Sequence, residues 1–422
     1  MLSAALYFLL QQPIGSPWWI YADADGTYTA SSLNLLTGKH TRYLDHPGLP
    51  EQELMAITFG TQHLWDRATG DHASARAHAD QLLNDLDATR PVFRGWAITF
   101  YLLGVVLAYA LVARLFGHWA WGVAGGLLWL GLPDLAVDSI QIRPDVLLSA
   151  LCLLAGYLLM SGFSRRDALR LAGAAFVVGF AMTAKLHAFG LVLPCLVAVV
   201  VAHPRGDWGR RLSERVRTFV RRRRAALASA AALWLAVAVA TNWPYVPFTA
   251  NALQRNAVFV PVLGVFGYAG LATFAHSTQR GWIARVLDPW YAVVAGSLVA
   301  GFLVPVTFFL QDGMQGLVAI FQSIQGKGVN QDIKAFTLDW HMFESWPLKQ
   351  GMVLFVLCGV GALVGLRRRT LWPALWFAGA AAMAMLAAIR LGAVRYFDPA
   401  YVWAIPGALW LRRERKIGRA HV

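Results

Sequence analysis

The sequence has few charged residues for its length. Lys, Arg, Asp and Glu make up 14% of its 422 residues, whereas a soluble globular protein carries about 25%. Hydrophobic residues make up 57%, and they fall in blocks of roughly 17–25 residues, the length of a helix that spans a bilayer. Repeated blocks of this kind exclude an ordinary soluble core and predict an all-α polytopic membrane protein.

Cysteines and recognisable cofactor motifs are also scarce. The three cysteines, Cys152, Cys195 and Cys358, lie inside apolar blocks without metal-ligand spacing, so we interpret them as small core residues and expect no disulfide framework. No nucleotide-binding motif is present, and the acidic and histidine residues within 311–350 suit no standard zinc motif. We therefore predict no metal site and no cofactor, and leave open whether a divalent metal is needed.

Acidic residues are fewer than basic residues in this chain. The chain carries 37 Lys and Arg against 23 Asp and Glu, a net charge of +14. In a soluble protein this excess would indicate a nucleic-acid partner. Here the basic residues cluster between apolar blocks, which is the positive-inside pattern of a membrane protein. We expect the run Arg221–Arg224 to contact anionic lipid head groups.

The apolar blocks predict about twelve transmembrane helices. They cover residues 1–20, 95–116, 119–133, 145–163, 171–184, 188–202, 225–243, 257–275, 290–310, 351–366, 371–389 and 401–411. A signal peptide is the alternative for 1–20, but the run lacks a basic flank. We therefore expect a first transmembrane helix, shortened by a truncated gene start. At the other end, residues 416–422 resemble translated sequencing adapter.

Two long polar stretches, 21–94 and 311–350, separate these blocks. If the first lies outside the cytoplasm, the second does too, and every strong basic cluster falls inside, including the loop 204–224. This orientation requires 171–184 and 188–202 to form a tight hairpin with its tip outside. The predicted organisation is listed here in chain order: a first helix (1–20), an extracytoplasmic catalytic loop with amphipathic helices (21–94), transmembrane helices (95–310), a second extracytoplasmic loop (311–350) and C-terminal transmembrane helices (351–411).

Two carboxylates, Asp23 and Asp25, follow the first predicted helix. A carboxylate at a partly dry membrane boundary can be tuned as a general base that takes a proton from a hydroxyl. The alternative is a helix cap, in which Asp25 or Thr27 begins a helix through residues 30–36. Further along the same loop, His46 is a candidate for binding a substrate hydroxyl or phosphate, or a solvated loop histidine.

These residues resemble the first outer loop of the GT-C glycosyltransferases. The resemblance rests on Asp25-Gly-Thr-Tyr28, on a following helix ending in Gly38, and on Tyr43-x-x-His46-Pro47. It is strongest to the protein O-mannosyltransferase and aminoarabinose (lipid A) transferase branch, of glycosyltransferase family 39 type. Family members carry Asp followed by an acidic residue. Here the pattern is Asp23-x-Asp25, which leaves open which Asp is the base.

The resemblance extends to cations that would meet the donor phosphate. Arg143-Pro-Asp145 is similar to the family's Arg-x-Asp segment, Lys185 lies where relatives carry a cation, and Arg395-Tyr396 resembles a late Arg-Tyr. A leaving phosphate gains charge as the glycosidic bond breaks, and Lys or Arg near the bilayer surface would stabilise it. The alternatives are that Lys185 only snorkels from a helix end and that Arg143 and Asp145 pair with each other as solvated flanks.

The resemblance implies a bacterial inner-membrane glycosyltransferase of the cell envelope. It would move a sugar from a polyprenyl-phosphate donor to a hydroxyl of a glycan, lipid or protein acceptor, with inversion, on the extracytoplasmic face. Asp25 or Asp23 would be the base. The phosphate-binding residues would be Lys185, Arg395, Tyr396 and Arg143, and the substrate-binding residues His46, Tyr28, Asp145 and His187.

A transporter or lipid flippase is the competing class. Such a protein predicts polar residues and Gly or Pro breaks at mid-membrane in two related halves. This chain instead concentrates its polar residues in two loops and shows no internal repeat. A non-catalytic scaffold would leave the Asp pair and the late Arg-Tyr without a purpose.

Overall fold

The computed structural model describes residues 22–37, 48–70, 73–141, 143–165, 167–201, 289–308, 350–390 and 397–420, with the single positions 222, 225, 229 and 232. Every secondary-structure element in these ranges is a helix, and no strand occurs in them. The all-α prediction is therefore confirmed for the described part of the chain.

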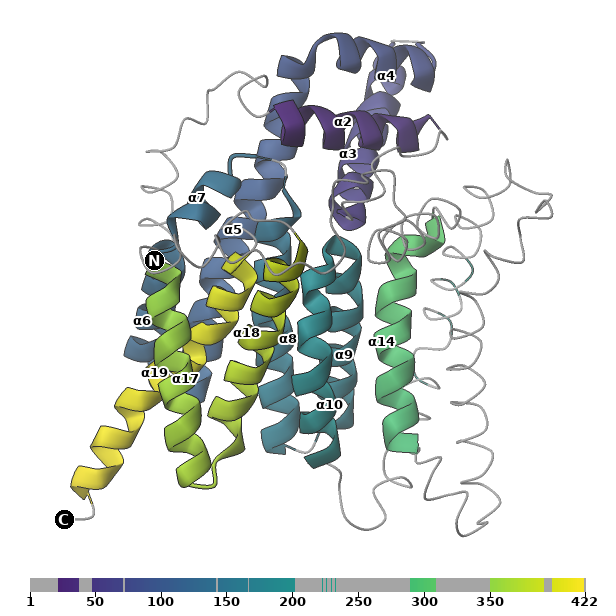
Figure 1. Cartoon of the computed structure of the whole chain (residues 1–422). Helices are drawn as coiled ribbons and strands as arrows, with labels where there is room; N and C mark the ends of the chain where they lie inside the picture. The colour runs from purple at the N-terminus through teal and green to yellow at the C-terminus, as the bar shows by residue number, and fades with distance from the viewer. Residues whose placement is uncertain are drawn as a thin grey trace, which may run out of the picture.

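Three helices form a layer over one end of a helical bundle (Figure 1). They are α2 (Ala22–Leu36), α3 (Leu49–Ala68) and α4 (Ala75–Asn84). A small apolar core joins this outer layer to the next helix; its buried members are Tyr28, Leu33, Met55, Phe59, Ala79, Leu82 and Phe93. The layer falls within 21–94, where the sequence predicts amphipathic helices.

Helix α5 (Leu86–Phe116) connects the outer layer to the bundle. Its start is capped by Asp85, whose carboxylate accepts a hydrogen bond from the Ala88 N–H at 3.2 Å, and such a cap satisfies one of the free amides of a first turn. Its end is set by Gly117, which adopts φ 70°, a left-handed conformation that suits glycine. The helix thus begins at Leu86 and not at residue 95, and it runs without a break from the outer layer into the bundle.

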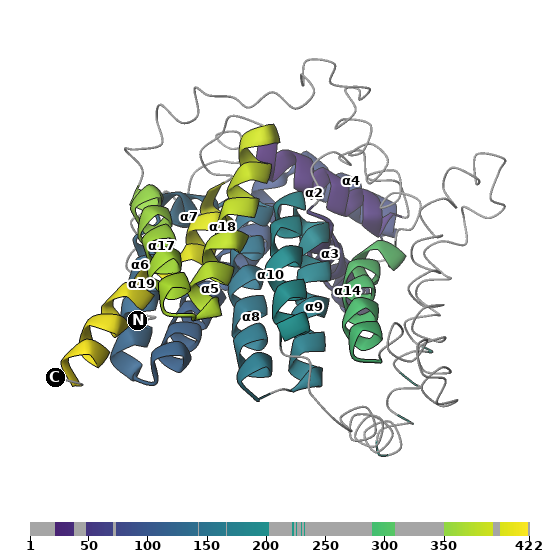
Figure 2. The ribbon, with the colours of Figure 1, turned by 60° about the horizontal axis from the view of Figure 1, so that its bottom comes forward.

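The remaining helices pack around α5. They are α6 (Trp119–Leu130), α7 (Pro133–Asp138), α8 (Pro144–Arg165), α9 (Ala168–Ala184), the 3-10 helix η2 (Leu186–Leu191), α10 (Val192–Val201), α14 (Pro289–Phe308), α17 (Gln350–Arg367), α18 (Leu371–Arg390) and α19 (Asp398–Ala420). Figure 2 shows α14 beside α9 at one edge of the bundle, and α17 and α18 on the opposite side.

Two of the described helices, Leu86–Phe116 and Pro144–Ser164, are long and apolar enough to cross a membrane. Several others are apolar but shorter, such as the 12-residue α6. At 1.5 Å per residue, α6 would cover about 18 Å, less than the roughly 30 Å of a hydrocarbon core. Helix α7 continues the path of α6 towards the outer layer (Figure 1). The count of twelve transmembrane helices stays a prediction.

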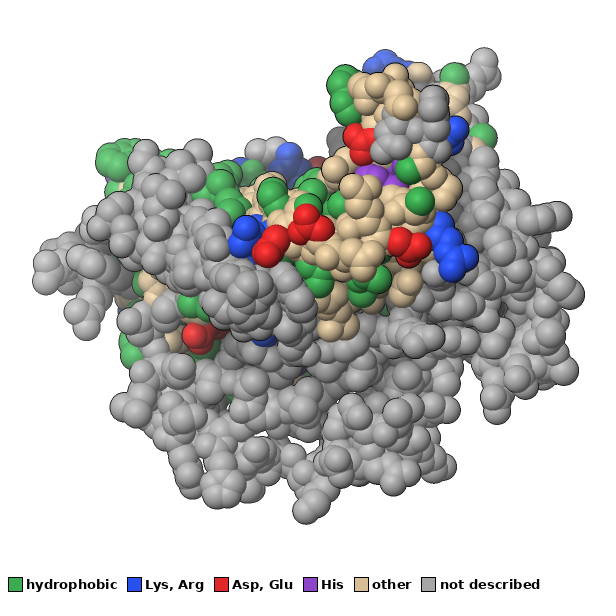
Figure 3. All heavy atoms as spheres, turned by 90° about the horizontal axis from the view of Figure 1, so that it is seen from above, with side chains coloured by type: hydrophobic (Ala, Val, Ile, Leu, Met, Phe, Trp, Pro, Cys, Tyr) green, Lys and Arg blue, Asp and Glu red, His purple; other side chains and the backbone are tan. Residues whose placement is uncertain are grey.

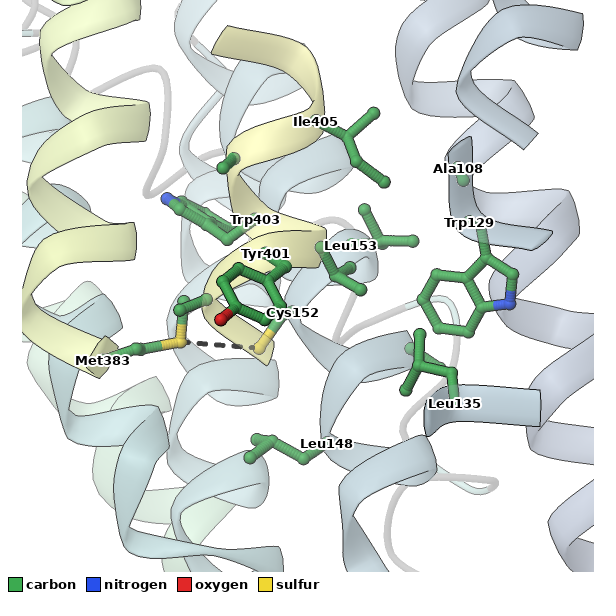
Figure 4. Packing of buried hydrophobic residues seen from close by; sticks show 14 of the residues in the cluster. Ala108, Trp129, Leu135, Leu148, Cys152, Leu153, Met383, Tyr401, Trp403 and Ile405 are labelled. Carbon is green, nitrogen blue, oxygen red and sulfur yellow. Dashed lines mark hydrogen bonds between the residues drawn. The ribbon is translucent and has the colours of Figure 1, made fainter. Parts of the chain in front are cut away.

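Large aromatic side chains fill the centre of the bundle. Trp129, Trp376, Trp403 and Tyr401 are all buried there, and Figure 4 shows Tyr401 and Trp403 of α19 close to Cys152 of α8 and Met383 of α18. The Cys152 Sγ lies 3.9 Å from the Met383 Sδ. All three cysteines are free and buried, which confirms their interpretation as core residues.

The chain breaks its helical path at Lys185. This residue ends α9 in an extended conformation, φ −162° and ψ 144°. The chain then continues through η2 into α10, and both contact α9. The predicted tight hairpin requires such a turn, and the turn brings residues 185–187 to the same end of the bundle as the outer layer.

Candidate functional site

Seven ionisable side chains gather where the outer layer meets the bundle. We call them the charged cluster: Glu51 of α3, Asp138 of α7, Arg143 before α8, Asp145 of α8, Lys185 after α9, His187 of η2 and Asp398 of α19. They are joined by ion pairs and by electrostatic interactions. Figure 3, seen from the outer-layer side, shows exposed acidic and basic side chains on this face, whereas most members of the charged cluster are buried.

Lys185 and Asp145 form the central ion pair. The Lys185 Nζ lies 2.5 Å from the Asp145 Oδ1, and both side chains are buried. Asp145 sits in the first turn of α8, directly after Pro144, where the helix dipole favours a carboxylate. Lys185 lies within reach of Asp145 because the chain after the break, in η2, contacts α8. Lys185 therefore ends in a buried pair, which distinguishes it from a lysine that only snorkels to the surface.

Arg143 makes a second pair beside the first. Its Nε donates a hydrogen bond to the Gln141 Oε1 at 2.6 Å and lies 3.8 Å from the Asp138 Oδ1. Arg143 is half-buried, and it also interacts electrostatically with Asp145. The alternative of a solvated Arg143–Asp145 flank does not hold, because Asp145 is buried against Lys185. The structure thus brings two of the predicted phosphate-binding cations, Lys185 and Arg143, into one cluster.

His187 completes the part of the cluster that the sequence predicts. It is buried in η2, two residues after Lys185, and its imidazole interacts electrostatically with Asp145. Of the predicted substrate-binding residues, Asp145 and His187 therefore lie together. Their shared surroundings arise from the break after α9 and from the start of α8.

Glu51 belongs to the cluster although sequence reasoning missed it. It lies in the first turn of α3, after Gly48-Leu49-Pro50. An acidic side chain at this position usually does no more than interact favourably with the helix dipole. Here its side chain is 4% exposed, and its Oε2 has no hydrogen-bond partner among the described residues. Burial raises the pKa of Glu51 well above its usual range, and the nearby Asp145 raises it further.

Asp398 was missed as well. It begins α19, two residues after Tyr396 of the late Arg-Tyr segment, and it is 1% exposed. Its Oδ2 is buried without a hydrogen-bond partner among the described residues. Asp398 interacts electrostatically with Asp138, Asp145 and Lys185. The available signal was a carboxylate just before an apolar block, a position that Asp398 shares with Asp145.

Tyr28 lies elsewhere. It is buried in the apolar core of the outer layer, and its ring packs against Gly48, where any side chain larger than hydrogen would collide with it. Gly48 also has φ 147°, a conformation that favours glycine. The structure thus shows Tyr28 in a packing position, and its role in substrate binding stays a prediction.

Helix α2 begins at Ala22, so Asp23 and Asp25 both belong to its first turns. The expectation that Asp25 or Thr27 caps a helix is therefore wrong: the helix starts before both residues. The side chains of Asp23 and Asp25 lie outside the described residues, and so do His46, Arg395 and Tyr396. Within the described ranges, no group of three or more His, Cys, Asp or Glu side chains is placed to hold a metal ion.

Comparison with known proteins finds one family that resembles part of the chain. Residues 87–216 match the family model described as "Dolichyl-phosphate-mannose-protein mannosyltransferase". The matched segment runs from α5 through α10 and contains five of the seven residues of the charged cluster; these five are Asp138, Arg143, Asp145, Lys185 and His187. This match supports a GT-C type glycosyltransferase, as the resemblance of the sequence predicts.

The match favours a transferase over the transporter or flippase alternative. Among curated proteins and among solved structures, no match was found. The apolar helices and the family match together make the transferase a membrane protein.

Proposed function

We propose that the transferase moves a sugar from a polyprenyl-phosphate donor to an acceptor hydroxyl, with inversion, at the outer end of the bundle. The observation that carries this proposal is the buried pair of Lys185 and Asp145 beside Arg143, within the segment that matches the mannosyltransferase family. Dolichyl phosphate, which the description of the family names, is a polyisoprenyl phosphate. The acceptor is a glycan, lipid or protein of the cell envelope, and no nucleic acid takes part.

The cations of the cluster receive the donor phosphate. In the structure Lys185 is neutralised by Asp145, so an incoming phosphate competes with this carboxylate for the ammonium group. The pair keeps Lys185 ordered and desolvated before the donor arrives, which lowers the reorganisation that binding would otherwise require. Arg143 offers a planar set of donors suited to phosphate oxygens, and Arg395 with Tyr396 completes the phosphate site.

The reaction is a single displacement. Asp25, or Asp23, accepts the proton of the acceptor hydroxyl, and the oxygen attacks the anomeric carbon as its bond to the phosphate oxygen breaks. The electron pair of that bond goes to the phosphate, whose added charge Lys185 stabilises. The products are a glycoside of inverted configuration and a polyprenyl phosphate. Substrate-binding residues around the reacting atoms are His46, Asp145 and His187, whereas Tyr28 supports this site from the apolar core of the outer layer.

The site faces the periplasm or cell exterior, in a bacterial inner membrane. Support comes from the helix ends: α5, α8 and α17 finish at the end of the bundle remote from the outer layer (Figure 1), and each finishes on or near an arginine. Basic residues favour the cytoplasmic side. The organisation we propose keeps the sequence-based order of about twelve transmembrane helices and two extracytoplasmic loops, 21–94 and 311–350.

Transfer from radiolabelled polyprenyl-phosphate sugars tests the proposal. Membranes containing the wild type, Asp23→Asn or Asp25→Asn are incubated with a donor panel that begins with mannose and glucose. We expect the wild type to transfer one of these sugars, and one of the two substitutions to lower the rate by at least about 10²-fold, the lower range of a general-base contribution.

Asp80→Asn is the matched control, since Asp80 is an exposed carboxylate of α4 in the same outer layer. This variant should transfer at the wild-type rate. Transfer that survives both Asp23→Asn and Asp25→Asn would remove the assignment of the base. A wild type that neither binds nor uses any donor of the panel would contradict the proposed donor class.

A further inference from the structure

We propose that Glu51 and Asp398 bind hydroxyl groups of the donor sugar and thereby help to select which sugar is transferred. This inference rests on the proposed function, because it takes the phosphate of a sugar donor to lie at Lys185. It assigns a role to the two carboxylates of the charged cluster that its ion pairs do not use.

The first observation is the charge balance of the cluster. Asp145 is matched by Lys185, and Asp138 by Arg143. Glu51 and Asp398 remain, and neither forms an ion pair within the described residues. A buried carboxyl without a partner is costly to keep, so these two side chains call for an explanation other than folding stability.

The second observation concerns individual atoms. The Glu51 Oε2 and the Asp398 Oδ2 are buried, and neither accepts a hydrogen bond from any described residue. An unsatisfied buried acceptor costs about 1–3 kcal/mol, and native proteins rarely leave one without a partner. A ligand that supplies hydrogen-bond donors removes this cost. Sugar hydroxyls are such donors, and they add no charge to a cluster that already holds two cations.

The third observation is position. Glu51 and Asp398 come from α3 and α19, far apart in the chain, yet each interacts electrostatically with Lys185, Asp138 and Asp145. They therefore both border the place where Lys185 meets the donor phosphate. A sugar bonded to that phosphate must lie next to it, within reach of the groups that surround Lys185.

Deoxy-sugar donors test the proposal directly. The probes are polyprenyl-phosphate mannose and its 2-, 3-, 4- and 6-deoxy analogues, or the same series of glucose if the panel selects that sugar. For the wild type, we expect kcat/KM to fall about 2- to 13-fold at each hydroxyl bound by Glu51 or Asp398, the range for a neutral hydrogen bond, because burial raises the pKa of both carboxyl groups.

The variants are Glu51→Met and Asp398→Leu, which remove the acceptor oxygens, with Glu51→Gln and Asp398→Asn, which keep one each. In Glu51→Met and Asp398→Leu, the deoxy penalty at one position should disappear, whereas the amide variants should retain most of it because their carbonyl oxygen still accepts a neutral hydrogen bond. Glu53→Gln is the matched control, because Glu53 lies on the same helix and its Oε1 is likewise buried without a hydrogen-bond partner among the described residues, yet Glu53 lies outside the charged cluster. It should keep every wild-type penalty.

The penalty is a ratio measured within each variant, so a smaller amount of folded protein affects both donors equally. For a variant too slow to assay, the ratio of the dissociation constants of the parent and deoxy donors replaces the ratio of their kcat/KM values. Penalties equal to those of the wild type at every position, in both Glu51→Met and Asp398→Leu, would overturn the inference while leaving the proposed function intact. A wild type that neither binds nor transfers any donor would overturn both.

Discussion

At the scale of single residues, the ion pair of Lys185 and Asp145 affects both the stability of the protein and its transfer activity, and these two effects can be separated. A buried pair contributes little net stability, but removing one partner leaves an uncompensated charge and costs about 3–5 kcal/mol. Replacing both partners with apolar residues of similar size is often neutral. Stability and activity should therefore respond differently to single and double substitutions.

We predict that Lys185→Met alone lowers the thermal midpoint of the detergent-solubilised protein and that Lys185→Met with Asp145→Leu largely restores it. Transfer should be lost in both, since neither keeps the ammonium group that meets the phosphate. Unfolding followed by tryptophan fluorescence measures the first effect, and the radiolabel assay measures the second. If the double variant recovered transfer together with stability, Lys185 would have only a structural role.

The positions of two other residues, Asp25 and Glu51, could not be predicted from the local sequence. Asp25 was weighed as a helix cap, but α2 already begins at Ala22. Glu51 has the position of an ordinary first-turn acid, yet tertiary contacts bury it beside Asp145. The sequence around Asp25 does not show that the helix begins at Ala22, and the sequence around Glu51 does not show that its side chain is buried. Both results depend on contacts with residues that are distant in the chain.

At the scale of secondary-structure elements, the contact between α9 and α14 depends on glycine. A Cβ added at Gly301 of α14 would collide with the backbone of Phe176 on α9, and one at Gly179 with the backbone of Leu298. In membranes, small residues let helix backbones approach closely, and van der Waals packing is a main source of helix association. Gly296, on the same helix as Gly301, has no atom within 4 Å of the Cβ position.

The same substitution at these two glycines should therefore have opposite results. Gly301→Ala should force α14 away from α9 and lower the thermal midpoint, whereas Gly296→Ala should be neutral or slightly stabilising, since alanine favours a helix by about 1 kcal/mol over glycine. Thermal unfolding of the two purified variants beside the wild type measures the difference. Equal midpoints would show that α9 and α14 do not approach as closely as the structure indicates.

At the scale of the whole molecule, the orientation of the bundle in the membrane can be tested by labelling introduced cysteines with a thiol reagent. The three native cysteines are buried, so they should react slowly with a thiol reagent. Arg76 of α4 is exposed in the outer layer, and Arg368 is exposed just after α17, at the remote end. A cysteine at either position would report which side of the membrane it faces.

We expect a membrane-impermeant maleimide to label Arg76→Cys in intact spheroplasts and Arg368→Cys only after the membrane is permeabilised. The positive-inside distribution of arginine is the reason. Labelling of Arg368→Cys in intact spheroplasts, with Arg76→Cys protected, would invert the orientation and place the charged cluster on the cytoplasmic side.

Much of the architecture could be predicted from the chain alone, because hydropathy is a local property. Apolar blocks determine helices by their length, and each backbone group is satisfied within its own helix. The same reasoning predicted the turn at residues 185–187 and the buried character of the cysteines. Charges inside or next to apolar blocks, such as Lys185 and Asp145, stood out because burying a charge is expensive.

By itself, then, the sequence determined that this is a helical membrane protein with cations and carboxylates at the ends of its helices. Only the tertiary structure decided which of them meet. Glu51, Asp145, Lys185 and Asp398 belong to four separate segments of the chain, and their proximity follows from the way α3 lies over the bundle and from the break after α9. Electrostatic interactions act through space, so the partners of a buried charge are set by packing and not by its neighbours in the sequence.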